Sequence, residues 1–210
     1  MEQRQGVFVR ASLYRLKKVI WALLFRGHTA QRFEPFLPRG GIVLDIGSGL
    51  GDRTSTLSSR DRLVIGVEPS PAEVKYAKSK HPTFGYVVGS GYSLPFRSRS
   101  FDAVTMIDVV HHLKRPADVI SEATRVANQQ VLIADICRLK GRVLKDLESL
   151  WLRVTDGGFS YFDLEGWHSL LGPQIQHEER YGTMNRAALF VVRAGVLQED
   201  ASHRMSHASH

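Results

Sequence analysis

Short apolar runs alternate with polar stretches along most of this chain. Apolar runs of this length, bounded by turn residues, are typical of buried strands. The predicted strands are Ile42–Ile46, Leu63–Val67, Phe84–Val88, Ala103–Ile107 and Val131–Asp135. Two further strands are predicted near the end, Gln176–Tyr181 and Ala187–Val192, with a turn between them. The spacing leaves room for a helix between most neighbouring strands.

The stretches between the strands contain the predicted helices. Ser70–Lys80 has a capping serine, Pro71 as its first helical residue and Glu73 at the third position, which is a favourable helix start. Arg115–Val126 is the second predicted helix, and the polar run from Asp52 begins a third. Strands that alternate with helices in this way predict an α/β domain with a parallel sheet and helices on both faces.

The segment 9–26 has a helical pattern of its own. Leucines and one isoleucine recur at steps of three and four residues, which lines up one face, and arginines and lysines lie between them. One interpretation is an N-terminal helix that packs over the rest of the domain. The other is a basic amphipathic helix on an anionic membrane surface, with Trp21 and Phe25 at the interface.

The first predicted strand leads into a loop with glycine at every second position. Asp45 precedes Gly47, Gly49 and Gly51, and glycine lets a backbone bend sharply and approach a ligand. The spacing is G-x-G-x-G, whereas dinucleotide-binding loops read G-x-G-x-x-G. An acid two residues before the first glycine suits a ligand with a positive charge. Glu68 ends the second strand, where a carboxylate accepts hydrogen bonds from ribose hydroxyls.

These residues resemble the class I S-adenosylmethionine (SAM) dependent methyltransferases. The segments Val87–Phe96 and Ser100–Leu113 resemble the type 11 branch, which includes the ubiquinone and menaquinone enzymes. The resemblance covers roughly 41–135. It implies a Rossmann-like, seven-stranded, mostly parallel sheet with an antiparallel C-terminal hairpin and helices on both faces. Ser90 departs from the family, which usually has an aspartate there for the adenine amino group. A neutral acceptor makes a weaker hydrogen bond than an ionised one.

The resemblance implies SAM as the cofactor and a crevice at the carboxyl ends of the strands. The implied cofactor-binding residues are Asp45, Gly47, Ser48, Gly49, Gly51, Glu68, Pro69, Ser90, Gly91 and Asp108. In this interpretation Asp45 and the glycines hold the methionine part and Glu68 the ribose. Ser90 and Gly91 contact the adenine, and Asp108 lies near the methionine part or the acceptor.

His111 and His112 are the candidate catalytic residues. They follow the fourth strand, near the expected methyl group, and histidine titrates in the range useful for a general base. The pattern does not distinguish which of the two is catalytic and which is structural. Methyl transfer from a sulfonium otherwise needs mainly alignment of the acceptor with the methyl group.

The predicted organisation is a single methyltransferase domain over 1–197. An insertion at 138–171, rich in aromatic residues, is expected to cover the substrate, and 198–210 is expected to be a disordered tail. The tail contains His203, His207 and His210. No metal site is predicted there, because no carboxylate or cysteine joins these histidines at a useful spacing.

Composition bears on the acceptor. The net charge of +7 and the isoelectric point of about 9.8 favour an acidic partner. The leading hypothesis is methyl transfer to a small-molecule or lipid-like acceptor, anionic ones included, with peripheral membrane contact through 9–26. The alternatives are an RNA methyltransferase, for which no RNA-binding module is apparent, and a non-catalytic SAM-binding protein. The single cysteine, Cys137, and the absence of a long apolar stretch fit a cytoplasmic protein.

Overall fold

The computed structural model describes residues 29–138, 158–182 and 186–194. The predictions for the N-terminal helix over 9–26, for most of the insertion and for the tail after 197 lie outside these residues. Within the three described ranges, no helix has the length and apolar character that crossing a bilayer requires.

One seven-stranded sheet forms the centre of the domain, in the order β3-β2-β1-β4-β5-β7-β6. The five strands from β1 to β5 run parallel, and β7 pairs antiparallel with both β5 and β6. The predicted parallel sheet with an antiparallel C-terminal hairpin is therefore confirmed. The strands are β1 (Gly41–Ile46), β2 (Arg62–Glu68), β3 (Gly85–Val88), β4 (Phe101–Ile107), β5 (Ala127–Ile136), β6 (Ile175–Tyr181) and β7 (Ala187–Arg193).

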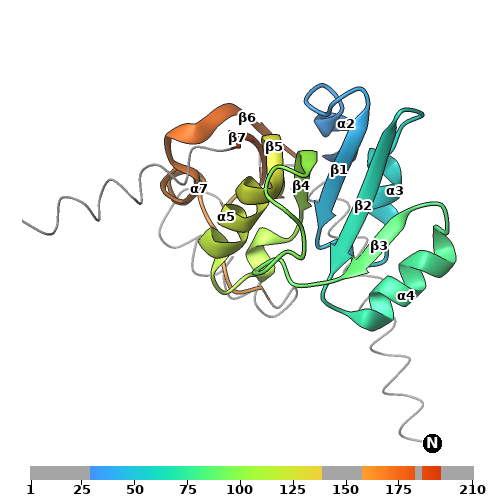
Figure 1. Ribbon diagram of the computed structural model, residues 1–210. Coiled ribbons are helices and arrows are strands. Elements are labelled where there is room, and N and C mark those ends of the chain that lie inside the picture. The colour runs from blue at the N-terminus through green and yellow to red at the C-terminus, as the bar shows by residue number, and fades with distance from the viewer. Residues whose placement is uncertain (1–28, 139–157, 183–185, 195–210) are drawn as a thin grey trace, which may run out of the picture.

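Helices cover both faces of the sheet (Figure 1). They are α2 (Thr29–Phe33), α3 (Asp52–Leu57), α4 (Pro71–Lys80), α5 (Pro116–Val126) and α7 (Leu164–Leu171), with 3₁₀ turns at Val110–His112 and Gly172–Gln174. The predicted start of α4 is confirmed, since the Ser70 side chain accepts a hydrogen bond from the Glu73 amide at 3.3 Å. The pattern did not predict α2 or α7.

Two large apolar clusters hold α2, α3, α5 and α7 on the sheet, and a smaller one holds α4 on β3. On one face α5 and α7 pack against β1, β4, β5 and β7, with Trp167 fully buried among them. On the other face Phe33 of α2 and Leu57 of α3 pack against the same strands. The strands are apolar on both sides because both sides are covered, which is the usual reason that a parallel strand reads as a continuous apolar run.

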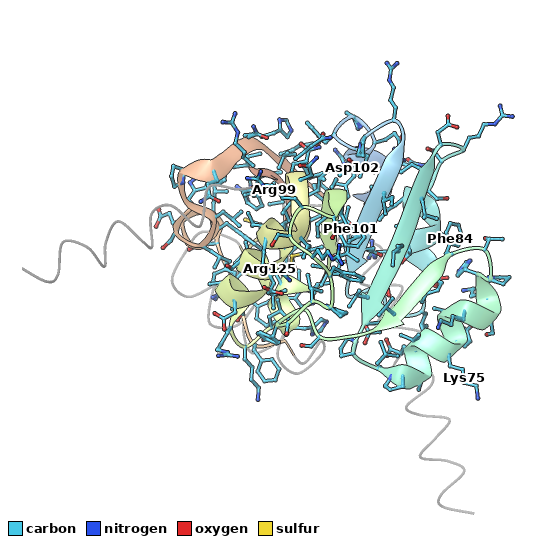
Figure 2. All side chains as sticks on the ribbon, viewed as in Figure 1. Lys75, Phe84, Arg99, Phe101, Asp102 and Arg125 are labelled. Atoms are coloured by element: carbon cyan, nitrogen blue, oxygen red, sulfur yellow. The ribbon has the colours of Figure 1, made fainter. Side chains whose placement is uncertain are left out.

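The parallel strands place two chemically different edges at opposite ends of the sheet. The arrowheads of β1, β2 and β3 meet at one edge in Figure 1, and the motif residues after these strands lie there. Asp102, at the start of β4, lies at the other edge (Figure 2). Its carboxylate accepts a hydrogen bond from the Ile42 amide at 2.9 Å, so it joins two strand starts.

Candidate active site

The glycine loop is folded back over the end of β2. The amides of Gly47 and Ser48 both donate to the Val67 carbonyl, at 2.8 and 3.1 Å. A Cβ at Gly47 would lie 2.4 Å from the Val109 side chain, so this position is closed by the protein itself. A Cβ at Gly49 would have only one described atom within 4 Å, a carboxylate oxygen of Glu73 at 3.5 Å. Gly49 is therefore the glycine of this loop that borders open space.

Glu68 fastens this loop to the end of β2. Its carboxylate accepts hydrogen bonds from the Gly49 amide at 3.2 Å and from the Ser70 amide at 3.0 Å. A carboxylate offers about four lone-pair sites, so these two bonds leave capacity for further donors such as ribose hydroxyls. Pro69, which follows, is exposed. Nearby Glu73 has a raised pKa, mainly because of burial and also because of the charge on Glu68.

Ser48 has a buried hydroxyl for which the described residues supply no hydrogen-bond partner. Buried polar atoms in folded proteins are nearly always paired, with protein, water or ligand. A Cβ on neighbouring Gly66 would lie 2.7 Å from this hydroxyl, so the packing around Ser48 is tight. An orphaned hydroxyl inside a ligand loop is what a site completed by its ligand would contain.

Asp45 lies within the protein. Its side chain is 2% exposed and accepts hydrogen bonds from the hydroxyls of Thr54 at 2.6 Å and Thr105 at 2.9 Å. Burial raises the pKa of this carboxyl to about 6, against the lowering effect of the two threonines and of Arg53. The structure therefore uses Asp45 to join α3 to β1 and β4 beneath the loop, and it does not bring this carboxylate to the surface of the crevice.

Ser90 and Gly91 begin the loop that follows β3. Ser90 is exposed, and its hydroxyl accepts a hydrogen bond from the Tyr92 amide at 3.2 Å. A Cβ at Gly91 would lie 2.9 Å from Val119 of α5, so this glycine allows the loop to pack against the helix. Arg125 of α5 holds the same loop by donating to the Leu94 and Phe96 carbonyls (Figure 2).

Asp108 follows β4 directly. Its backbone is left-handed, with φ of 54°, and its amide donates to the Ala134 carbonyl at 2.9 Å. Its carboxylate forms an ion pair with Arg53 of α3. Burial raises the pKa of Asp108, and the Arg53 charge opposes this shift. Arg53 was not among the residues that the sequence motifs single out.

The two histidines occupy different environments. His111 is 2% exposed, and its ring Nδ1 lies 2.5 Å from the carboxylate of Asp135 at the end of β5. The backbone amide of His111 also donates to Asp135, at 3.2 Å. His112 is exposed, and its ring lies against that of His111 with centroids 4.0 Å apart.

The described part of the insertion covers His111. The amides of Phe159 and Ser160 both donate to the His111 carbonyl, at 2.7 and 3.0 Å. The ring of Tyr161 stacks on the His111 ring, with centroids 5.8 Å apart and planes 15° from parallel. The insertion thus reaches the edge of the sheet at the candidate base, as a substrate-covering segment would.

Asp135, like Arg53, is a residue at this edge that motif reasoning missed. A signal for it was present, because Asp135 closes the last predicted parallel strand and so had to lie beside the ends of the others. Of the predicted residues, the structure places the glycine loop, Glu68, Ser90, Asp108 and the histidines at this one edge. Asp45 lies beneath them.

Comparison with known proteins identifies this arrangement. Residues 44–134 match the type 11 family described as a methyltransferase domain. Among curated proteins, an uncharacterized methyltransferase of Mycobacterium sp. (strain JLS) is 35% identical over 89 residues, 42% of this chain and 35% of its own length. The demethylmenaquinone methyltransferase of Renibacterium salmoninarum is 29% identical over 87 residues, 41% of this chain and 37% of its own length.

Solved structures share the fold. A putative methyltransferase from Bacillus halodurans C-125 has a TM-score of 0.70 at 16% identity, over 80% of this chain and 99% of that one. Magnesium protoporphyrin IX methyltransferase from Synechocystis PCC 6803, with bound S-adenosylhomocysteine, has a TM-score of 0.61 at 18% identity, over 80% of each chain.

The fold and the matched residues are similar to those of class I SAM-dependent methyltransferase domains. Within the chain, the match to the type 11 methyltransferase family extends over residues 44–134. The chain spans little more than a third of the length of the curated relatives that it matches.

The residues at this edge fit the cofactor of the family. Gly49 borders open space, Ser48 carries a hydroxyl without a partner among the described residues, and the Glu68 carboxylate is fixed beside the loop with capacity for further donors. Arg53 and Asp108 add one positive and one negative charge beside the loop.

Proposed function

We propose that this protein transfers a methyl group from SAM to a small-molecule or lipid-like acceptor, by in-line displacement at the sulfonium. The observation that carries the proposal is the position of the buried His111–Asp135 pair. It lies at the same sheet edge as the glycine loop and Glu68, one strand further along. The proposed cofactor site and the candidate base therefore lie at the same end of the sheet, on neighbouring strands.

The glycine loop would hold the cofactor's methionine part and Glu68 its ribose, while Ser90 and Gly91 would contact its adenine. The sulfonium supplies an electrophilic methyl group. The protein's contribution is to fix both reactants in line, which accounts for about 7–11 kcal/mol of barrier lowering in well-oriented reactions. The segment 158–162 packs over His111 and supports this alignment by limiting the space above the base.

His111 is the proposed base, and Asp135 is a positioning residue. An ionised carboxylate accepts hydrogen bonds only, so the ring Nδ1 must donate to it. The neutral ring then carries its lone pair on Nε2, the nitrogen that would take a proton from an acceptor hydroxyl or amine. Asp135 also stabilises the imidazolium that forms. His112 is exposed, and its ring lies tilted against that of His111, so it serves as packing for the ring.

The acceptor class is proposed from chemistry and from one relative. The R. salmoninarum protein is named for a demethylmenaquinone acceptor, which is lipid-like. The net charge of +7 suits an anionic acceptor or an anionic membrane surface. We extend the proposal to peripheral membrane contact through 9–26 and to a cytoplasmic location. The same charge favours RNA as the second candidate acceptor.

Two measurements test the proposal in sequence. Isothermal titration with S-adenosylhomocysteine establishes whether the cofactor site binds with one-to-one stoichiometry. Transfer of a radiolabelled methyl group is then measured with three separate pools: lipid extract with quinones, small metabolites, and RNA. Label in the lipid or metabolite pool is expected. Label in RNA alone would move the assignment to the second candidate, and binding without transfer to any pool would indicate a non-catalytic SAM-binding protein.

A further inference from the structure

Two basic side chains lie over aromatic rings beside the candidate base. The Lys114 ammonium lies 5.3 Å from the centroid of the Phe159 ring. The Arg115 guanidinium lies at the same distance from the centroid of the Tyr92 ring. A cation within about 6 Å of a ring centroid is attracted by the face of the ring. Because Lys114 and Arg115 follow His111 closely along the chain, positive charge and aromatic surface occur together next to this base.

Hydrogen bonds fix the backbone of Phe159 relative to His111. The Phe159 amide donates to the His111 carbonyl at 2.7 Å. On the next residue, the Ser160 hydroxyl donates to the Leu113 carbonyl at 2.7 Å. On the preceding residue, a Cβ at Gly158 would lie 2.7 Å from the His111 carbonyl oxygen, so the chain passes directly against the turn of the base. The Phe159 ring is therefore held close to His111.

The segment 158–162 lies on the side of His111 that faces away from the proposed cofactor site. In the sheet, β4 lies between β5 and β1, and β1 leads into the glycine loop. His111 follows β4, whereas the end of β5 pairs with the segment through Cys137 and Phe162. In-line displacement requires the acceptor and the leaving sulfur on opposite sides of the methyl group. The acceptor is therefore expected on the side of 158–162.

A second lysine over an aromatic ring provides a comparison. On α4, Lys80 lies 5.8 Å from the centroid of the Tyr76 ring, and its ammonium is paired with Asp52 at 2.5 Å. Lys114 has a ring of the same kind, but within the described parts of the chain no carboxylate lies at ion-pair distance from it. Lys114 is exposed, and Phe159 is 58% exposed. The acid that completes the group on α4 has no counterpart here among the described residues.

We propose that Lys114 and Phe159 form the acceptor subsite, and that they select an acceptor with a carboxylate or phosphate group on a flat apolar body. The apolar body lies against the Phe159 ring. The anionic group binds the Lys114 ammonium and supplies the missing acid. A hydroxyl or amine of the same molecule is then presented to His111. This inference rests on the proposed methyl transfer and names the class of its acceptor.

The contact between the lysine and the ring prepares this subsite for an anion. It restricts the Lys114 side chain before binding, so less rotamer freedom is lost when the anion binds. A lysine ammonium is a compact point charge, which suits carboxylate and phosphate alike. An ion pair that stays in contact with water changes affinity by up to about 5-fold, and salt screens it. The subsite should therefore prefer an anionic ligand over its neutral counterpart by about 3- to 5-fold.

The experiment is a fluorescence titration of the full chain with two probes, anilinonaphthalene sulfonate and phenylnaphthylamine. Both probes have a flat apolar body, and only the first carries an anion. The variants are Lys114→Met, Lys114→Arg and Phe159→Leu. The matched controls are Lys75→Met and Tyr76→Leu, which remove an exposed charge and an exposed ring from α4, beside the edge strand β3 (Figure 2). Thermal melting establishes that each variant is folded, and probe binding elsewhere on the protein is common to all of them.

The wild type should bind the sulfonate probe about 3- to 5-fold more tightly than the neutral probe at low salt. Lys114→Met should remove this preference, and Lys114→Arg should keep it. Phe159→Leu should weaken the binding of both probes, and the two controls should match the wild type. If Lys114→Met keeps the preference, or the wild type has none, the acceptor subsite is wrong while the proposed function stands.

Methyl transfer distinguishes the two sources of the anionic group. A product methylated on a hydroxyl or an amine keeps its carboxylate or phosphate, so an anion exchanger should retain the labelled product. Retained label from the metabolite pool indicates a free metabolite, and retained label from the lipid extract indicates a lipid headgroup. Lys114→Met should lower the yield of retained product by about 3-fold or more, and Lys75→Met should not. Label only in unretained product overturns the subsite, whereas transfer to neither pool overturns the proposed function.

Discussion

The carboxylate of Asp135 accepts hydrogen bonds from both the ring Nδ1 and the backbone amide of His111. The two bonds fix the position of the residue and the orientation of its ring together. They join the turn after β4 to the end of β5, and Tyr161 closes the site from the insertion. With Asp135 ionised, an imidazole held in this way donates from Nδ1 and keeps its lone pair on Nε2, as the proposed general base requires.

Replacing His111 tests this role against that of its neighbour. His111→Gln should lower kcat for a protic acceptor by about 10²–10⁴-fold, the range for a lost general base. KM for SAM should change little, because the cofactor contacts other residues. His112→Gln, the matched control, should keep kcat within a few-fold. Steady-state kinetics of both variants decide, and a larger loss in His112→Gln would reverse the assignment.

Asp135→Asn tests the positioning role. The amide of asparagine cannot supply the negative charge that stabilises the imidazolium, and it can present an N–H to the ring in place of an acceptor. For these reasons kcat should fall without a matching rise in KM. Asp135→Glu, which keeps the charge on a longer side chain, should restore part of the activity. A purely structural role would instead lower the melting temperature and affect both kinetic constants in proportion to the folded fraction.

Substitutions at Gly47 and Gly49 should distinguish an effect on stability from an effect on cofactor binding. Both have left-handed backbones, so alanine costs about 1–2 kcal/mol of conformational strain at either position. At Gly47 the new Cβ also meets Val109 at 2.4 Å, which adds an overpacking cost of about 1–3 kcal/mol. At Gly49 it borders open space.

Gly47→Ala should therefore lower the free energy of unfolding more than Gly49→Ala, measured by chemical denaturation. Gly49→Ala should lower affinity for S-adenosylhomocysteine more than 10-fold, and Gly49→Val should abolish binding. Wild-type affinity in Gly49→Val would mean that the cofactor lies elsewhere.

Ser90 marks the expected adenine contact. Ser90→Asp should keep or strengthen cofactor binding, since an ionised acceptor adds about 1 kcal/mol, or roughly 5-fold, to a bond from the adenine amino group. Ser93→Asp controls for the added charge, because Ser93 is exposed on the same turn. Titration with S-adenosylhomocysteine measures both. A large loss in Ser90→Asp alone would place the adenine away from this residue.

The strands and the position of their carboxyl ends could be predicted from the sequence. Burial on both faces of the sheet requires long apolar runs, and glycines follow them. Leu44, Val64 and Val104 lie inside the domain for this reason. Helix α7 was missed because its residues were assigned to an insertion that covers the substrate, and no helix bounds were predicted within it. Its start nevertheless carries a local signal, since the Asp163 side chain accepts a hydrogen bond from the Gly166 amide.

The position of the site at the strand ends could be predicted from the sequence, but the hydrogen bonds and ion pairs of its side chains could not. Strand ends converge whatever their side chains do, so Glu68 and Asp108 could be placed from the sequence. The direction of a side chain depends on which face of the sheet its position in the strand points to, and on partners far along the chain. Asp45 faces α3 and is bonded to Thr105, sixty residues away. No local pattern contains that contact, nor that between Arg53 and Asp108.

The segment 9–26 should govern the acceptor and not the cofactor. Its basic amphipathic pattern precedes every cofactor motif, so removing 1–26 should change affinity for S-adenosylhomocysteine by no more than a few-fold while methyl transfer falls sharply. Association with anionic vesicles should weaken with salt, since exposed charges are screened within about 10 Å at 0.1 M. Sedimentation with vesicles and gel shift with bulk RNA separate the two partners. Full activity without the segment would limit it to packing.

Asp45 should make stability depend on pH. Its pKa is about 6 in the folded protein and 3.8 as an isolated group. Between these values the folded protein holds a proton that the unfolded chain has lost, so raising the pH favours unfolding. The contribution of Asp45 to stability is therefore complete below about pH 4, declines between about pH 4 and 6, and is lowest above that range. Two pKa units correspond to about 3 kcal/mol.

Asp45→Asn removes this decline, because the amide does not ionise. The free energy of unfolding of both proteins is measured by denaturation at pH 4 to 8. As the pH rises, the wild type should lose stability relative to Asp45→Asn, and the difference should then become constant. Thr105→Val keeps the shape of the side chain and removes one hydrogen bond that lowers the pKa of Asp45. It should extend the decline above pH 6. Parallel curves for wild type and Asp45→Asn would show that Asp45 is ionised throughout, and that its two threonine bonds outweigh its burial.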